Sequence, residues 1–133
     1  MSYKSFKREL ENYEEYHVIV FELKREIADM FYELTGVKGV SYEKQPSSFN
    51  PDLSAERKLE LIDLYNQKLE ELKHYQSTIR YVDMKLRGLT DEEKRIILDV
   101  ASGRITYEEA GKQYGYSKGH MWKKVRKILE EIL

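Results

Sequence analysis

The chain has 133 residues, of which 35% are charged and 41% hydrophobic, and its formal net charge is −1 at pH 7. This composition excludes a disordered chain and is typical of an ordered protein with long solvated helix faces. The absence of cysteine excludes disulfides and thiolate metal sites. Because the sequence has neither an apolar run of about eighteen residues nor the apolar core of a signal peptide, we expect a cytoplasmic protein that does not enter a membrane.

Apolar residues recur at heptad spacing over residues 3–34, which predicts one long amphipathic helix. Residues 35–53 follow with both prolines of the chain and two of its glycines, and we expect an irregular linker there. The heptad register of the first helix is carried by Phe6, Tyr13, Val20, Ile27 and Leu34.

A second helical pattern covers residues 54–87. Two helices of similar length joined by a linker favour an antiparallel hairpin, which we expect over residues 1–87. Additional aromatic residues such as Phe21 and Tyr32 widen the apolar stripes. We therefore expect the hairpin to pair with a second copy, as a homodimer or a higher homo-oligomer; in the alternative it packs only on the C-terminal part of its own chain.

Shorter helices are expected in residues 88–133, where two capping-box patterns begin at Thr90 and Thr106. Gly115 is placed to end the second of these helices, and Ser117 is placed to cap a third. The expected fold is therefore all-α: a long antiparallel helical hairpin over residues 1–87, followed by a small helix-turn-helix domain over residues 88–133.

The segment around Gly111 and Gly115 has the features of a helix-turn-helix, with a small residue where two helices cross and a glycine in the turn. The helix that follows Ser117 is strongly basic, with five cations and no acid up to Lys127. This charge predicts a helix that enters the major groove of duplex DNA, although a merely solvated face is the alternative. The cations are Lys118, Lys123, Lys124, Arg126 and Lys127.

The predicted DNA-binding residues fall into three groups. The first residues of the helix are expected near base edges, and the later cations near phosphates or guanines. Two tyrosines that flank the preceding helix are expected to bind phosphate, whereas Trp122 is expected to seal the edge of the core. The set is Tyr107, Tyr116, Ser117, Lys118, Gly119, His120, Lys123, Lys124, Arg126 and Lys127.

The run GLTDEEKRIILDVASGRITYEEAGKQYGYSKGHMWKKVRKILEEIL resembles region four of bacterial sigma factors. With the helical pair in front of it, the chain is similar to the phage ArpU and RinA type transcriptional regulators. The resemblance implies that residues 106–114 form a supporting helix and residues 117–133 a recognition helix. It commonly places an apolar residue where this chain has Lys124, with Val125 one place later. The residues it places nearest the bases are Lys118, Gly119, His120, Trp122 and Lys123.

We therefore expect a sequence-specific DNA-binding transcriptional regulator encoded by a phage or prophage. Two alternatives stay open: a sigma-like adaptor that binds RNA polymerase, and a DNA-recognition subunit of phage packaging machinery. The sequence contains no phosphate-binding glycine loop, nucleophile elbow or HExxH pattern, so no enzymatic activity and no cofactor are expected. His17 and His74 lack ligand spacing, and no metal site is expected.

Overall fold

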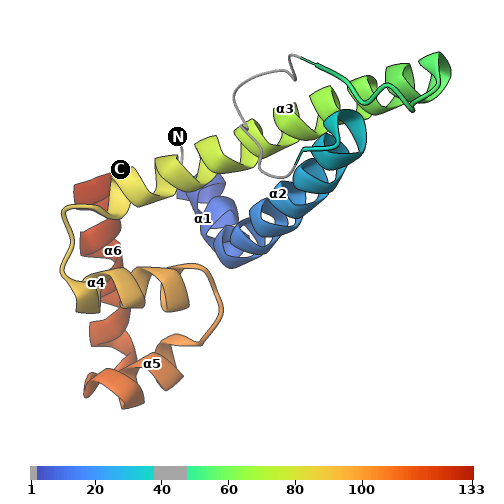
Figure 1. Cartoon of the computed structure of the whole chain (residues 1–133). Coiled ribbons are helices and arrows are strands. Elements are labelled where there is room, and N and C mark those ends of the chain that lie inside the picture. The colour runs from blue at the N-terminus through green and yellow to red at the C-terminus, as the bar shows by residue number, and fades with distance from the viewer. Residues whose placement is uncertain (1–2, 38–47) are drawn as a thin grey trace. The chain divides into compact units, whose positions relative to one another are not determined.

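The computed structural model describes residues 3–37 and 48–133, and in this part of the chain every regular element is helical, as the sequence predicts (Figure 1). The centre of the predicted linker, residues 38–47, lies outside the described residues. Across the described ranges, no helix is both long enough and apolar enough to cross a membrane. The elements are α1 (Tyr3–Glu11), α2 (Tyr13–Thr35), α3 (Ala55–Leu86), α4 (Asp91–Ile96), the π-helical turn η1 (Ile97–Ala101), α5 (Tyr107–Tyr114) and α6 (Lys118–Ile132).

The prediction of one continuous helix over residues 3–34 is wrong, because the helix is interrupted at Asn12. The Asn12 side chain donates a hydrogen bond to the carbonyl of Arg8 at 3.0 Å, and the Asn12 backbone N–H donates to the same carbonyl. Asparagine competes for backbone groups in this way and favours helix ends over helix interiors. The interruption separates α1 from α2.

The structure divides into two compact units whose bounds differ from the predicted ranges 1–87 and 88–133. Unit 1 combines Met1–Glu14 with Thr78–Leu133, and unit 2 is Glu15–Ser77. The difference has a physical cause: apolar residues of α1 and of the last turns of α3 complete the core under α4 to α6. That core contains Phe6, Leu10, Val82, Leu86, Ile96, Ile97, Val100, Ala101, Ala110, Met121, Val125, Ile128 and Leu129.

Polar contacts reinforce the attachment of the N-terminal segment within unit 1. The hydroxyl of Tyr13 donates a hydrogen bond to the Asp83 carboxylate, and partial burial together with this bond raises the pKa of Tyr13. The Arg104 guanidinium lies 2.8 Å from the carboxylate of Glu14. Residues that are far apart in sequence therefore hold unit 1 together.

In unit 2, α2 runs antiparallel to the part of α3 that faces it (Figure 1). Glu33 pairs with Arg57 at 2.9 Å and Glu26 with Lys68 at 3.1 Å, so residue numbers rise along one helix as they fall along the other. Exposed ion pairs of this kind contribute little stability, and the apolar core between the helices carries most of it. That core contains Leu23, Ile27, Leu34, Leu61, Tyr65, Leu69 and Leu72.

Two glycines shape the connection between α5 and α6, and the predicted end of α5 at Gly115 is confirmed. Gly115 adopts a left-handed conformation with φ of 78° and ends α5, donating its N–H to the carbonyl of Gly111. The N–H of Tyr116 donates to that carbonyl at 2.8 Å. A Cβ atom on Gly111 would overlap the carbonyl oxygen of Tyr116, so the turn lies directly against α5 at this residue.

We predict that Gly111→Ala destabilises the protein by about 1–2 kcal/mol. Alanine gains roughly 1 kcal/mol of helix propensity over glycine, but the new methyl group meets backbone that no side-chain rotation can move. Urea unfolding measures the free energy of unfolding. The matched control is Gly88→Ala, because a Cβ there has nothing within 4 Å. A Gly111→Ala protein as stable as the wild type would contradict the close contact.

Candidate nucleic-acid interface

The apolar face of α6 determines how the helix is oriented about its own axis. Met121, Val125, Ile128 and Leu129 are each at most 3% exposed in the core of unit 1. Ile132, near the end of the helix, is only half-buried, whereas Leu129 is fully buried. With Val125 inside, the exposed side of the helix is the one that carries its basic residues.

The first turn of α6 is capped by Ser117, whose hydroxyl oxygen accepts a hydrogen bond from the backbone N–H of His120 at 3.1 Å. Lys118 and Gly119 follow and are exposed. A Cβ on Gly119 would meet nothing within 4 Å, so the fold itself does not require glycine there. The exposed N-terminus of a helix attracts anions, because its free N–H groups and the helix dipole point the same way.

No carboxylate lies within ion-pair distance of the cations of α6 among the described residues, although the charges of Glu92 and Glu93 act on Lys124. Within residues 3–37 and 48–133, every ion pair lies elsewhere in the chain. Five positive charges therefore occupy the segment up to Lys127, and acids return only at Glu130 and Glu131. A concentrated positive field of this kind attracts polyanions even when the whole chain is nearly neutral.

The structure divides the ten predicted DNA-binding residues into an exposed set and a half-buried set. The half-buried residues make contacts within the protein that the sequence did not indicate. The exposed set is Ser117, Lys118, Gly119, His120, Lys123, Arg126 and Lys127, and the half-buried set is Tyr107, Tyr116 and Lys124.

Lys124 and Tyr116 interact with each other on one flank of α6. The Lys124 ammonium donates a hydrogen bond to the Tyr116 hydroxyl at 3.1 Å and lies 4.8 Å from the centre of the Tyr116 ring. This hydrogen bond raises the pKa of Lys124. The His120 ring also packs near Tyr116, with its centre 4.7 Å from that of the Tyr116 ring. Lys124 is therefore less available to an external anion than Lys123.

Tyr107 packs against the core of unit 1, and burial raises the pKa of its phenol. Tyr107 is half-buried, unlike the exposed residues of α6. The sequence analysis predicted that its hydroxyl binds phosphate.

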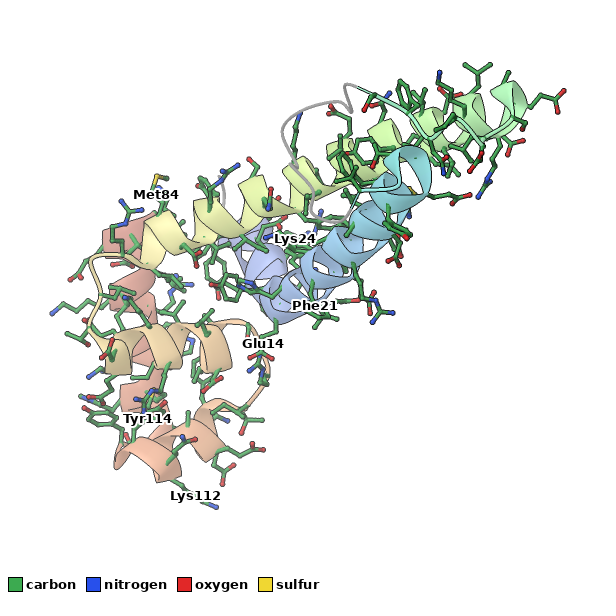
Figure 2. All side chains as sticks on the ribbon, viewed as in Figure 1. Glu14, Phe21, Lys24, Met84, Lys112 and Tyr114 are labelled. Carbon is green, nitrogen blue, oxygen red and sulfur yellow. The ribbon has the colours of Figure 1, made fainter. Side chains whose placement is uncertain are left out.

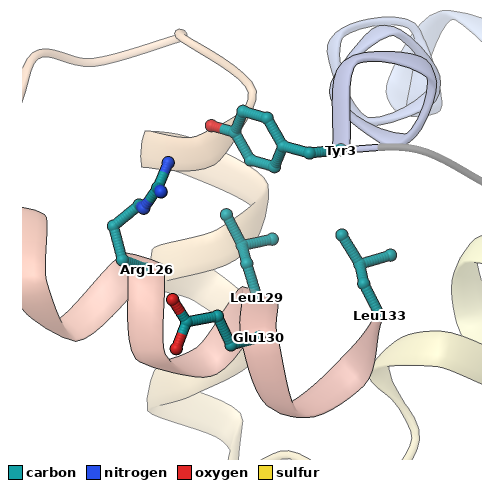
Figure 3. A pocket seen from close by; sticks show the side chains of 5 residues that line it. All are labelled: Tyr3, Arg126, Leu129, Glu130 and Leu133. Carbon is teal, nitrogen blue, oxygen red and sulfur yellow. The ribbon is translucent and has the colours of Figure 1, made fainter.

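Trp122 is 48% exposed, so the expectation that it seals the edge of the core is wrong. The guanidinium of Arg126 lies 5.3 Å from the centre of the Trp122 ring, an arrangement that the spacing of four residues along a helix allows. Arg126 also lies 6.0 Å from the ring of Tyr3. Figure 3 shows Arg126 reaching from α6 toward Tyr3. No pattern in the sequence indicates that Tyr3 lies beside α6.

Two hollows flank the exposed face of α6 within unit 1. One, of about 330 Å³, is lined by Tyr3, Arg126, Leu129, Glu130 and Leu133 (Figure 3). The other, of about 410 Å³, brings lysines together with two carboxylates. Its lining residues are Glu93, His120, Lys123, Lys124, Lys127, Ile128 and Glu131.

Glu93 in the second hollow is held by the capping box of α4. Its carboxylate accepts a hydrogen bond from the backbone N–H of Thr90 at 3.0 Å, and its own N–H donates to the Thr90 hydroxyl oxygen at 3.2 Å. The bond from the Thr90 backbone lowers the pKa of the Glu93 carboxyl. Glu93 therefore caps the N-terminus of α4, and its negative charge reduces the positive potential on this flank of α6.

Comparisons of the chain with family models, with curated proteins and with solved structures found no match. Among the residues that the structure describes, no three carboxylate or histidine side chains gather as metal ligands would. The function is therefore inferred from the residues of α5 and α6 and from their geometry.

We predict that Glu93 makes the folded state sensitive to acid. Because its pKa is lower in the folded than in the unfolded chain, its ionised form contributes stability at neutral pH, and this contribution is lost as the pH falls through the folded-state pKa. The Glu93→Gln variant keeps an acceptor but does not titrate, so its melting temperature should fall less between about pH 6 and about pH 3. The control is Glu130→Gln, which removes an exposed carboxylate of α6. Equal acid sensitivity of the Glu93→Gln protein and the wild type would refute this role.

Proposed function

We propose that α5 and α6 form a helix-turn-helix and that the protein is a non-enzymatic, sequence-specific binder of duplex DNA that regulates transcription. The observation that carries this proposal is the run of cations over the first two-thirds of α6, of which Lys118, Lys123, Arg126 and Lys127 are exposed and form no ion pair within the described residues. The resemblance of residues 88–133 to sigma factor region four, and of the whole chain to the ArpU and RinA type regulators, supports this function and a phage or prophage origin.

In this proposal α6 lies in the major groove, which is about 12 Å wide and admits one helix. Lys118, Gly119 and His120 approach base edges from the first turn, and Lys123 and Lys127 approach phosphates. Trp122 joins this set because it is exposed beside the same residues. Lys124 and Tyr116 act on the flank, where the Tyr116 hydroxyl accepts from Lys124 and still has its own proton to donate.

Unit 2 supplies the second element of the proposal. Its antiparallel helices α2 and α3 serve as the hairpin through which two or more copies associate, and a dimer would present two copies of α6 to two DNA half-sites. In the sigma-like adaptor alternative, the protein binds RNA polymerase. A packaging subunit would instead assemble as a ring, which the mass of the complex distinguishes.

We predict that binding to duplex DNA weakens steeply with salt. With about five phosphate contacts per copy, the logarithm of the binding constant should fall against the logarithm of salt concentration with a slope of roughly −4 to −5. Fluorescence anisotropy with a labelled duplex, repeated over a series of salt concentrations, measures the slope. Binding that does not respond to salt would rule out the proposed interface.

A double variant that reverses two charges of α6, Lys123→Glu and Lys127→Glu, tests the same interface. The double variant should lose measurable DNA binding, because it replaces two phosphate contacts by two repulsions. Lys73→Glu in unit 2 is the control for reversal of an exposed lysine. Binding that survives the double reversal would favour the adaptor that docks on RNA polymerase.

We predict opposite effects of Gly119→Ala on stability and on binding. Alanine should stabilise α6 by up to about 1 kcal/mol, because Gly119 is helical and its Cβ has open space. The added methyl group stands where the backbone would approach DNA, so affinity should fall several-fold. Thermal unfolding and fluorescence anisotropy measure the two effects. An alanine variant that is more stable and binds equally well would remove Gly119 from the interface.

A further inference from the structure

The outer face of α2 exposes large apolar side chains. Val18 is 56% exposed, Phe21 66% and Tyr32 52%, all within unit 2. They lie on the side of the helix opposite to Leu23 and Ile27, which are buried against α3. Figure 2 shows Phe21 on the side of α2 that points away from α3. Single exposed apolar residues are ordinary, but these three share one stripe.

The stripe has a heptad pattern of its own. Val18, Arg25 and Tyr32 are spaced by seven residues and take the a positions of a coiled coil. The d positions, each three residues later, are Phe21, Ala28 and Thr35. This pattern is separate from the buried face of α2, which is already occupied by α3. We call residues 18, 21, 25, 28, 32 and 35 the outer seam.

We infer that the outer seam of α2 binds the outer seam of a second copy of this chain, with the two helices antiparallel. In a parallel pair Arg25 would face Arg25 of the second copy, and the two charges would repel each other. In an antiparallel pair each a position faces a d position. Tyr32 then faces Phe21 of the second copy, and Arg25 faces Ala28 of the second copy.

Charge complementarity supports this occupant. Arg25 and Asp29 are both exposed, and neither takes part in an ion pair within the described residues. Asp29 follows Ala28, so in the antiparallel pair the long Arg25 side chain ends beside Asp29 of the second copy. The two-fold symmetry of such a dimer makes every contact twice, including two aromatic pairs between Phe21 and Tyr32. The outer seams of two copies are therefore complementary to each other.

Three kinds of contact, each made twice, form a short interface, smaller than the roughly 800 Å² per partner of a standard complex. The dimer should therefore dissociate in the micromolar range. The inference identifies the surface for the self-association proposed for unit 2, and it does not depend on DNA binding.

The first experiment measures the mass of the full chain without DNA by sedimentation equilibrium over a range of concentrations. We expect a monomer–dimer equilibrium. Phe21→Ala should raise its dissociation constant about tenfold or more, because each copy loses a large apolar contact. The matched control Leu59→Ala removes an exposed apolar side chain from α3 and should leave the constant unchanged. Circular dichroism checks that each variant keeps its helix content.

The second experiment tests the register. Arg25→Glu alone and Asp29→Arg alone should each weaken the dimer, because each places like charges opposite one another. An equal mixture of the two variants should restore it as a heterodimer, since the reversed charges then match across the seam. Asp63→Arg reverses an exposed charge on α3 and leaves the outer seam intact, so this control variant should dimerise as the wild type does.

Three results would overturn the inference. A wild-type chain that stays monomeric at every concentration would show that the seam does not bind itself. A dimer that Phe21→Ala leaves unchanged would place the interface elsewhere. A mixture no more dimeric than either charge variant alone would contradict the antiparallel register. A chain that stays monomeric would also remove the self-association proposed for unit 2, whereas DNA binding is measured separately by fluorescence anisotropy, so the two failures are distinguishable.

Discussion

The burial of the apolar face of α6 is the constraint on which the arrangement of unit 1 depends. Each large apolar side chain that leaves water contributes about 1.5–3 kcal/mol, whereas an exposed ion pair contributes less than about 1 kcal/mol. Met121, Val125 and Ile128 therefore decide how the helix is rotated, and its cations take the side that remains. The positive face is a consequence of apolar packing on the opposite side of the same helix.

Features set by neighbouring residues were predictable from the sequence. The capping box at Thr90, the left-handed turn at Gly115 and the cap at Ser117 all depend on contacts within a few residues. The interruption at Asn12 was not predicted, because the heptad pattern continues through it. Heptad spacing indicates an apolar stripe, but it does not indicate which core the stripe joins, and α1 joins a different core from α2.

The candidate site was predictable in its charge and less so in its contacts. The five cations of α6 are visible in the sequence, but the pairing of Lys124 with Tyr116 depends on how the turn brings Tyr116 back beside the helix. Trp122 was assigned to the core because tryptophan is usually buried. The spacing of Trp122 and Arg126 by four residues was the available signal that the two side chains stack on the helix surface.

The discontinuous make-up of unit 1 has a consequence for the order of events during synthesis. Every core residue of unit 2 has been added to the growing chain once the ribosome passes Ser77. The core of unit 1 needs Phe6 from α1 and Leu129 from α6. Phe6 and Leu10 therefore lack part of their final core until residues as far as Leu129 have been added, and contacts of such long range close slowly. The helix that carries the positive charge is the last helix of unit 1 to be added, so its exposed face takes shape only after unit 2 has its whole core.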